Sequence, residues 1–564
     1  MSTYIYDAVS LKNLLSLRNI YTYTQSIKNY FLKIKSYKKI SKISKTNNIG
    51  NDILICKEKY LDHQKFTSRK VINVDSIDIC IFKNILVGVD DEIGFGVFLK
   101  KEAINYPDIL INGYYQYKNK KIQFSKIIEK KVLKELFKPT YWIDIVLDIP
   151  DSLINNKISI FIDNINISKN EKLFLSNNIL YKHKPKKPKL ILILSLDAVS
   201  DIDIKDYQDN LFPTFKKLED EGFIKFNNAI SSSTVTASSA ASLLAGVPLS
   251  KHKMFDYDEW YFSDKLKKIS PKLKLISEML SEQDYYTSAV TTFSKWRPHS
   301  GFSRGFNEYL NFCSGALHNS SYKSKVFEVL SKAKNYNVFA LFHLPGAHPP
   351  YIAKINNYTN NNLKNVYLET LKSNDDLIGQ IISYLKEMNI FDDSLIYITS
   401  DHGRGIDGYS RYGYQFKDER LRVPLYIKEP YNINLNKENY VSANTFIYDM
   451  ILNNFNTKNN DYINKNNYDG INWLSETFNY KTKKHIGFVG YGYGLKFVVE
   501  INFNKYTDVF YEIDSIVILN LDDNIVENSK YLEICRISIL KYLESNNYDN
   551  KTYIQSKDAY ILES

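Results

Sequence analysis

The sequence predicts an α/β fold with a mostly parallel central sheet, preceded by a β-sandwich-like domain. Two apolar runs, LILILSL at 190–196 and SLIYIT at 394–399, predict strands buried on both faces, which is typical of parallel sheets. Between them, helical patterns such as NLKNVYLETLKSNDDLIGQIISYLKEMNI alternate with strand-like pieces such as YNVFALFHL. This alternation is typical of an open α/β sheet with helices on its faces.

The β-sandwich prediction rests on the sequence before residue 181. Short β-rich runs there, among them IDICIFKNILVGV, YWIDIVLDI and KISIFIDNINI, are separated by Asn, Asp, Gly and Pro turn signals. The stretch YKHKPKKPK follows, and its charge and prolines predict a linker. We therefore expect a basic, mostly helical segment at 1–50, a β-rich domain at 51–181, a linker at 182–189 and the α/β domain at 190–564.

The charge pattern argues against nucleic acid as a partner. The net charge of +11 is modest for 564 residues, and basic residues are interleaved with acidic ones outside two short runs. No nucleic-acid-reading module is recognisable. The first basic run, KNYFLKIKSYKKISKISK, predicts a solvated helix or tail, and its apolar spacing leaves a weak membrane-surface contact open.

Cysteine usage and hydropathy predict a cytoplasmic location. Cys56, Cys80, Cys313 and Cys535 are scattered without CxxC spacing, so neither a zinc site nor a disulfide framework is expected from them. No signal-peptide pattern is evident, and no apolar run approaches the roughly eighteen residues that a membrane-spanning helix needs. Reduced thiols in a cytoplasm fit this pattern.

Candidate metal ligands follow the two predicted buried strands. Asp197 ends the first run, and Asp401 and His402 follow the second. In α/β sheets the chemistry lies at the carboxyl ends of the strands. An adjacent Asp and His offer a hard oxygen and an imidazole nitrogen to one divalent cation. The alternatives are a helix cap for Asp197 and a hydrogen-bonded loop for the pair.

A hydroxyl-rich stretch, SSSTVTASSAASLLAG at 231–246, lies between these strands and ends in an apolar turn and a glycine. A threonine or serine at the N-terminus of a helix has its hydroxyl in the positive field of the helix end. A bound metal lowers the pKa of such a hydroxyl further and makes it a nucleophile. The stretch therefore predicts a nucleophile beside the metal site.

The ordered set of Asp197, TASSAASLLAG, FHLPGAHPPY, SDHG and KDERLRVPLYI resembles the sulfatase branch of the alkaline phosphatase superfamily over roughly 190–530. The resemblance implies an alkaline-phosphatase/sulfatase-like domain and places Thr236 at the nucleophile position. Ser239 stands at the family's serine and Ala240 at its arginine. Because the family's Cys/Ser-x-Pro-Ser-Arg motif for formylglycine is missing, sulfate-ester hydrolysis by the usual route is not expected.

A threonine nucleophile is similar to that of the phosphoglycerol and phosphoethanolamine transferases, such as the lipoteichoic acid synthase group. That resemblance implies one Mn or Zn ion held by Asp197, Thr236, Asp401 and His402. A second metal is not expected, because Leu344 stands where an Asp-x-x-x-His motif ending at His348 would need its aspartate.

The same resemblance implies groups that handle the substrate. In TTFSKWRPHS, Arg297 is expected to be catalytic, while Lys295, Trp296 and His299 bind substrate; the alternative is a core Trp296 in a solvated basic loop. His348 and Lys417 are expected to assist the leaving group. The remaining candidates are expected to be structural or on the surface: His343, His252 and Arg422.

The expected function is metal-dependent phosphoryl-group transfer through a covalent Thr236 intermediate, with a surface glycan or its precursor as acceptor. A phosphorylated small molecule is the other expected substrate. Hydrolysis of a phosphodiester or phosphomonoester is the first alternative. A sulfatase-like hydrolase and a glycan-binding protein without catalysis are further ones.

Overall fold

The computed structural model describes the parts of the chain that follow, and all structural statements below concern them. They are residues 53–60, 63–70, 79–98, 108–129, 142–166, 174–184, 187–254, 268–312, 320–344, 363–404, 416–430, 437–454, 466–478, 485–504 and 509–546. The expected helical segment at 1–50 lies outside them.

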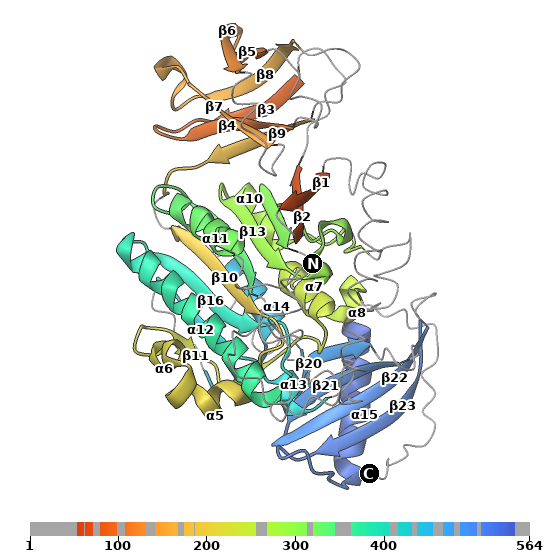
Figure 1. Ribbon diagram of the computed structural model, residues 1–564. Coiled ribbons are helices and arrows are strands. Elements are labelled where there is room, and N and C mark those ends of the chain that lie inside the picture. The colour runs from red at the N-terminus through yellow and green to blue at the C-terminus, as the bar shows by residue number, and fades with distance from the viewer. Residues whose placement is uncertain are drawn as a thin grey trace, which may run out of the picture.

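The central sheet has the strand order β1-β2-β14-β13-β15-β10-β16-β17-β11 (Figure 1). The five strands from β14 to β16 in this order are parallel, while β2, β17 and β11 pair antiparallel at the two flanks. The predicted α/β fold with a mostly parallel sheet is confirmed. The strands are β1 (Ile53–Tyr60), β2 (His63–Lys70), β10 (Leu190–Leu196), β11 (Ile224–Lys225), β13 (Tyr286–Thr292), β14 (Glu308–Phe312), β15 (Val338–Leu344), β16 (Ser394–Ser400) and β17 (Leu425–Lys428).

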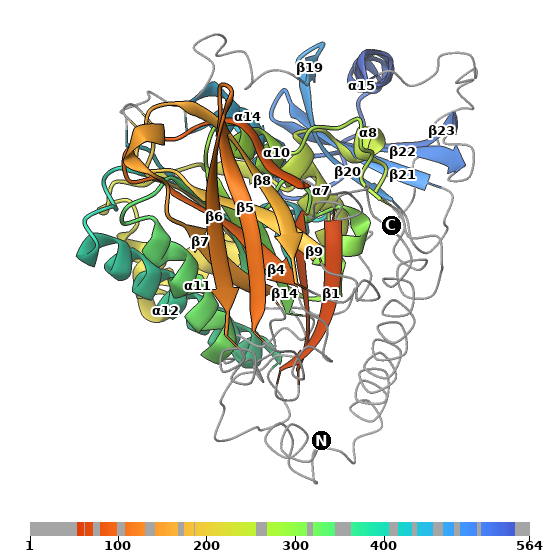
Figure 2. The same ribbon diagram turned by 90° about the horizontal axis from the view of Figure 1, so that it is seen from above.

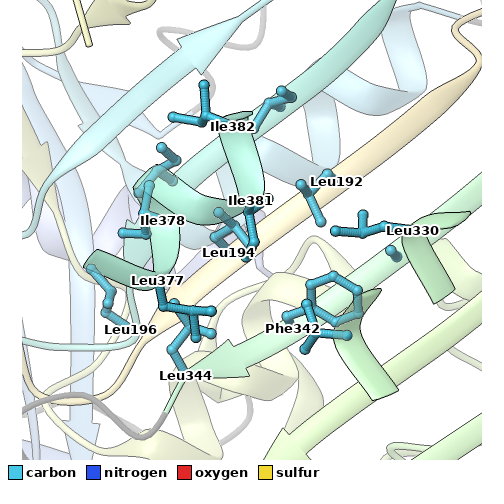
Figure 3. Close-up of a cluster of buried hydrophobic side chains, with 14 of the residues drawn as sticks. Leu192, Leu194, Leu196, Leu330, Phe342, Leu344, Leu377, Ile378, Ile381 and Ile382 are labelled. Atoms are coloured by element: carbon cyan, nitrogen blue, oxygen red, sulfur yellow. The ribbon is translucent and has the colours of Figure 1, made fainter. Parts of the chain in front are cut away.

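Helices cover both faces of this sheet, and β10 shows how one strand serves two cores. Leu192, Leu194 and Leu196 pack against α12 and neighbouring helices on one face (Figure 3). Ile191 and Ile193 belong to the core on the other face, with α7. The first face is covered by α5 (Asp201–Leu211), α6 (Pro213–Lys217), α11 (Ser320–Lys332) and α12 (Leu363–Glu387), the second by α7 (Thr236–Ala245), α10 (Ile276–Glu282) and α14 (Ala443–Asn453).

The strict alternation of side chains along a strand decides which face the site residues take. The odd-numbered residues of β10 and β16, such as Ile193 and Tyr397, pack on the α7 side. Asp197 and Asp401 continue this odd register just beyond the two strand ends, so they are directed toward α7. The sequence pattern of two buried strands therefore also positions the carboxylates.

A β-sandwich lies before β10 in the chain, as predicted. Its two sheets have the orders β3-β8-β5-β6 and β7-β4-β9 and enclose one apolar core. The strands are β3 (Ile79–Leu86), β4 (Glu92–Phe98), β5 (Ile109–Tyr117), β6 (Lys120–Ile128), β7 (Trp142–Leu147), β8 (Lys157–Ile165) and β9 (Phe174–Leu180).

The expected start of the β-rich domain at residue 51 needs a correction. The hairpin of β1 and β2 belongs to the central sheet, because β2 pairs with β14 in an antiparallel register. This pairing supplies hydrogen bonds to the backbone of β14, which would otherwise be an open sheet edge. The sandwich is therefore inserted between β2 and β10 of the α/β domain.

The linker at 182–189 is fastened to the amino ends of the parallel strands. Lys184 forms an ion pair with Asp284 before β13, and Lys189 pairs with Asp393 before β16 at 2.6 Å. The N–H of Asn337, just before β15, donates to the carbonyl of Tyr181 at 2.9 Å. The sandwich consequently lies at the edge of the sheet opposite to the carboxyl ends, as Figure 1 shows.

A second, antiparallel sheet completes the α/β domain, with the order β19-β20-β21-β22-β23. Helix α15 packs on it, and Figure 2 shows this layer on the side away from α11 and α12. Its elements are β19 (Asn467–Tyr468), β20 (Ile471–Phe478), β21 (His485–Gly492), β22 (Leu495–Asn504), β23 (Val509–Leu519) and α15 (Ser529–Ser545). Two short strands, β12 (Asn228–Ile230) and β18 (Tyr440–Ser442), form a parallel pair beside it.

In the part of the chain that the structure describes, no helix has the length and apolar character that crossing a bilayer requires.

Candidate active site

The predicted ligands meet at the carboxyl ends of β10 and β16. Candidate ligand atoms of Asp197, Asp401 and His402 all lie within 4.8 Å of one another, and all three side chains are buried. The Oδ1 atom of Asp401 accepts the N–H groups of Ala198, at 2.9 Å, and of His402, at 2.7 Å. Two backbone donors thus hold one carboxylate oxygen of Asp401 in place.

The second oxygen of Asp401 is available to a cation. Among the described residues, Oδ2 of Asp401 is buried and has no hydrogen-bond partner. It lies 3.6 Å from Nε2 of His402. A buried carboxylate oxygen without a donor is costly unless something positive binds it, so this atom fits a metal ligand.

His402 presents the correct nitrogen to such a cation. Its Nδ1 lies 2.9 Å from the carbonyl oxygen of Gly403. A proton on Nδ1 donates to that carbonyl and leaves the lone pair of Nε2 directed at the site. Burial lowers the pKa of the imidazole, and the nearby Lys295 and Arg420 lower it further against the opposing charge of Asp401. A neutral imidazole is the form that binds metals.

Thr236 is the first residue of helix α7 and its side chain is fully buried. Its Oγ1 lies 3.2 Å from Nε2 of His402. Two ligands of a tetrahedral zinc ion, each at about 2.0–2.1 Å, are separated by roughly 3.3 Å. The spacing therefore fits two atoms that share one cation, while the helix N-terminus adds its positive field at Oγ1.

The other hydroxyls of the 231–246 stretch hold this arrangement together. Ser231 Oγ donates to the carbonyl of Asp401 and lies 2.6 Å from the carbonyl of Ser233. Ser239 Oγ donates to the same Ser233 carbonyl at 2.7 Å. Because these side chains are buried, each needs such a partner. The hydroxyls thus connect the loop before the nucleophile to the loop of the Asp–His pair.

The C-terminal sheet braces the same loop from the other side. The N–H of Thr234 donates to Oγ1 of Thr477 on β20 at 3.0 Å, and the N–H of Glu476 donates to the carbonyl of Ser232 at 2.9 Å. Lys496 on β22 pairs with Asp418 at 3.0 Å and also with Asp523. Glu476 and Thr477, which lie far beyond the predicted motifs, therefore fix the nucleophile loop, and sequence reasoning missed them.

The tripeptide at 420–422 joins the three segments that carry the site. The carbonyls of Arg420, Leu421 and Arg422 accept hydrogen bonds, in that order, from the N–H groups of Gly403 at 2.8 Å, Ser231 at 2.7 Å and Asp201 at 3.2 Å. Each donor lies within five residues of a predicted ligand or nucleophile. The short segment before β17 is thus a backbone template for the site.

Three cationic residues lie on the segments near the Asp401–His402 pair. Lys295 and Arg420 both lower the pKa of His402, and Arg404 follows the Asp–His–Gly sequence directly. Burial lowers the pKa of the Arg420 guanidinium to about 10, with a further contribution from the charge of Arg404. All three side chains are half-buried. Sequence reasoning selected Lys295 and missed Arg404 and Arg420.

One predicted substrate contact, Trp296, needs correction. Trp296 is fully buried in the core on the α7 face, where its ring packs against Phe302 and His343 at centroid distances of 5.5 and 5.1 Å. It cannot stack on a substrate there. Lys417 is exposed and lies just before helix α13 (Asp418–Leu421). Arg420 lies within this helix, and its charge lowers the pKa of His402. The role of Lys417 stays a prediction, and Arg420, which sequence reasoning missed, is a further cation close to His402.

The remaining predicted residues fall into three groups. Arg297 is buried, at 1% exposure, where the 3-10 turn η3 (Ser294–Trp296) ends. Arg422 pairs with Asp418 at 2.6 Å and is structural, in line with the prediction. His348 lies outside the described residues, and the side chain of His299 does too.

Two further histidines are buried. His343 packs in the core beside the site; burial lowers its pKa to about 4, with opposing contributions from Asp401 and His402. His252 was expected on the surface, which is wrong. It is 2% exposed, with Nε2 3.0 Å from Ser242 Oγ, and burial lowers its pKa to about 3. The sequence around a single histidine in a short helix does not indicate whether that side chain faces the core or the solvent.

Known proteins share this fold and this sequence region. Residues 188–452 match the sulfatase family. A multifunctional alkaline phosphatase superfamily protein, PehA of Trinickia caryophylli, is 25% identical over 174 residues, which cover 27% of this chain. The chain spans about a third, 34%, of the length of that curated relative.

Solved structures are similar to this chain as well, and the first of them supports the α/β fold. The putative sulfatase yidJ of Bacteroides fragilis is similar with a TM-score of 0.51 at 16% identity, covering 65% of this chain and 98% of that one. The lipoteichoic acid synthase LtaP of Listeria monocytogenes gives a TM-score of 0.44 at 17% identity, covering 67% and 97%. The match of residues 188–452 to the sulfatase family, together with the similarity to PehA, relates this part of the chain to the sulfatase branch of the alkaline phosphatase superfamily.

Proposed function

We propose that the chain catalyses metal-dependent phosphoryl-group transfer with Thr236 as the nucleophile. The observation that carries this proposal is the position of Thr236 Oγ1, at the N-terminus of α7 and 3.2 Å from His402 Nε2. A hydroxyl in that place is poised both to lose its proton and to attack. The transferred unit is a phosphoryl-linked substituent, and the acceptor is a glycan or its precursor.

The donor set supports one divalent cation, Mn or Zn. Asp197, Asp401 and His402 offer two carboxylates and a neutral imidazole, and Thr236 adds its oxygen. A cation bound there supplies positive charge that lowers the pKa of the hydroxyl and stabilises the oxygens of the phosphoryl group.

The protein's own groups account for the two chemical steps. Thr236 loses its proton, its Oγ1 forms a bond to phosphorus, and the electron pair of the ester bond departs with the leaving oxygen, which takes up a proton. Lys295 and Arg297 offer positive charge to the phosphoryl oxygens as negative charge builds on them. An acceptor hydroxyl then attacks the same phosphorus and restores Thr236. We assign protonation of the leaving oxygen to His348.

Hydrolysis of a phosphodiester or phosphomonoester is the second candidate, because water can replace the acceptor in the second step. The similarity to a relative named a multifunctional alkaline phosphatase superfamily protein favours it. A sulfatase reaction is less well supported, since a threonine occupies the nucleophile position and Ala240 occupies that of the family's arginine.

The setting of the reaction is also a proposal. The thiols of Cys80 and Cys535 are free, which is typical of a reducing compartment such as the cytoplasm. The sandwich is fastened at the edge of the sheet opposite to the site. A contact between the sandwich and a glycan would therefore hold a long polymer near the enzyme without entering the site.

The test of the nucleophile compares Thr236→Ala with Ser238→Ala. Ser238 lies in the same buried helix turn, and its hydroxyl donates to the carbonyl of Met254 at 2.7 Å, away from His402. Metal-loaded protein is assayed on p-nitrophenyl phosphate, its phenylphosphonate and phosphodiester analogues, and p-nitrophenyl sulfate. We expect Thr236→Ala to lose at least about a thousandfold in turnover, whereas Ser238→Ala keeps most of it.

Trapping the intermediate separates this proposal from a binding role. Mass spectrometry of acid-quenched protein should find one phosphoryl-linked group on the peptide that contains Thr236. Unimpaired turnover of Thr236→Ala on any phosphorus ester would show that another group is the nucleophile.

A further inference from the structure

A strained turn connects β13 to the residues assigned to the phosphoryl group. Phe293 follows the last residue of β13 and has a φ of +62° and a ψ of 157°. This conformation is essentially restricted to glycine, because a side chain on the Cα atom crowds the backbone there. The 3-10 turn η3 begins directly afterwards and contains Lys295, and Arg297 follows it. The reversal of the chain at Phe293 therefore decides where Lys295 and Arg297 lie.

The turn lies beside the nucleophile helix. Element η3 contacts α7, whose first residue is Thr236. The ring of Trp296 belongs to the core on this face, together with Ala237 and Ala240 of α7. A phenylalanine keeps the strained conformation of residue 293 only where its surroundings hold it. The question is therefore which groups hold this turn.

Two side chains of the neighbouring strand β14 do so. Nδ2 of Asn311 donates to the carbonyl oxygen of Phe293 at 2.9 Å and to Oγ1 of Thr291 at 2.9 Å. The hydroxyl of Tyr309 donates to the carbonyl oxygen of Trp296 at 2.5 Å. Both side chains are fully buried. We call Asn311 and Tyr309 the β14 clamp, because their bonds fix η3 at its beginning and at its end.

The register of the sheet places the β14 clamp. Asn311 pairs with Thr291, and Tyr309 pairs with Ala289, across the parallel strands β13 and β14. Side chains at every second position share one face of a sheet, so both members of the clamp lie on the same face. Tyr309 and Ala289 belong to the core on the α7 side, which identifies that face. On its other edge β14 is held by β2, so the clamp is part of the sheet and not of the turn.

We propose that the β14 clamp positions Lys295 and Arg297 by keeping the strained turn at Phe293 closed. This inference rests on the proposed function, because it takes the assignment of the two cations from there. Neither member of the clamp needs to touch the substrate. Without a bond of the clamp the backbone relaxes at Phe293, and the relaxation moves both cations away from the phosphoryl group.

The experiment measures anion binding and needs no turnover. Metal-loaded, full-length protein is titrated in a calorimeter with propylphosphonate, which has no ester bond to break. We expect Asn311→Leu to bind it about tenfold more weakly than the parent, which corresponds to the loss of one to two buried hydrogen bonds. Tyr309→Phe loses one hydroxyl and should bind it about fivefold more weakly.

Tyr285→Phe is the matched control for Tyr309→Phe. Tyr285 is 2% exposed, and its hydroxyl donates to the carbonyl oxygen of Pro188 at 2.8 Å, beside the amino end of β13. Both changes remove one buried hydroxyl bond and should lower the melting temperature by a similar amount. Only Tyr309→Phe should weaken the binding of propylphosphonate, whereas Tyr285→Phe should stay within about twofold of the parent.

Glycine at position 293 tests the strain itself. In Phe293→Gly the turn adopts its φ and ψ without steric cost, so the clamp is no longer needed. Adding Asn311→Leu to Phe293→Gly should therefore weaken binding by less than about twofold, against about tenfold in the parent background. A purely structural contribution of Asn311 would be the same in both backgrounds. If Phe293→Gly does not fold, Tyr309→Phe and Tyr285→Phe still decide the question.

Four results would overturn the inference. They are no binding of propylphosphonate by the parent, parent-like binding by both clamp variants, equal losses of binding in Tyr309→Phe and Tyr285→Phe, and equal losses from Asn311→Leu in both backgrounds. Unimpaired turnover of Thr236→Ala would contradict the nucleophile assignment and leave these binding differences intact, so the two proposals fail separately.

Discussion

Gly403 offers the sharpest test of how the site is assembled. It lies between the Asp–His pair and Arg404, and its N–H donates to the carbonyl of Arg420. A Cβ at this position would lie under 3.0 Å from the carbonyl oxygen of Glu419 and 3.1 Å from the Cα of Arg420. Both neighbours are backbone atoms, so no side-chain rotation can relieve the contact. The change Gly403→Ala must separate helix α13 from the loop of His402.

The structure gives the size of the effect. The backbone hydrogen bond lost in Gly403→Ala contributes about 1 kcal/mol, and the overpacking against α13 costs about 1–3 kcal/mol more. We therefore expect the free energy of unfolding to fall by about 2–4 kcal/mol. A shift of His402 by about 1 Å is enough to reduce turnover by about a hundredfold.

Gly222→Ala is the matched control for Gly403→Ala. Gly222 has a φ of +87° and is exposed, and an added Cβ would meet no atom within 4 Å. This change costs about 1 kcal/mol of left-handed backbone strain and should leave activity unchanged. Thermal unfolding, bound-metal content and turnover are measured for both variants. Parent-like metal content and turnover in Gly403→Ala would refute the close packing of α13 against the site.

Three further changes probe the surroundings. Glu429→Gln should be more stable than the parent by about 2 kcal/mol at pH 8 and equal to it at pH 4. Burial raises the pKa of this carboxyl to about 7 in the folded protein, so ionising it at pH 8 costs stability that the neutral glutamine does not lose. Thermal unfolding against pH checks this, and a pH-independent difference contradicts it. Ser231→Ala should weaken metal binding about tenfold, because it removes the hydroxyl that holds the carbonyl of Asp401; a metal titration decides, with Ser231→Thr expected to restore part of the affinity. Lys496→Met should cost about 2 kcal/mol by leaving Asp418 with one cationic partner fewer; an unchanged melting temperature would show that the pair contributes nothing.

The sequence was sufficient to predict the parallel sheet and the residues at its carboxyl edge. Strands buried on both faces appear as unbroken apolar runs, and the residues that follow two such runs must meet at one edge. Asp197, Asp401 and His402 could be found for that reason. The density of hydroxyls before an apolar helix predicted a nucleophile in the 231–246 stretch, and the resemblance to the sulfatase branch selected Thr236 within it.

The sequence was least informative where the direction of a side chain decides its role. Trp296 and Lys295 are adjacent in one short turn, yet one is in the core and the other is half-buried near His402. Lys417 and Arg420 are separated by less than one helical turn, and the start of α13 between them could not be placed from an irregular, charged stretch. The spacing of apolar residues reveals the periodicity inside a helix or strand. These residues lie where helices and strands begin or end, so the spacing does not predict the direction of their side chains.

The hydrogen bonds of residues 420–422 explain why the site depends on the edge of the sheet. Their carbonyls accept the N–H groups of Gly403, Ser231 and Asp201, and β17, which begins at Leu425 after two intervening residues, pairs antiparallel with β16. The pairing of β17 with β16 therefore brings all three loops to their positions at once. A defect in this one strand would separate the Asp–His pair from the nucleophile even if both segments kept their own local structure. Assembly of the site is thus coupled to completion of the sheet, and variants at this edge should lose metal binding together with stability.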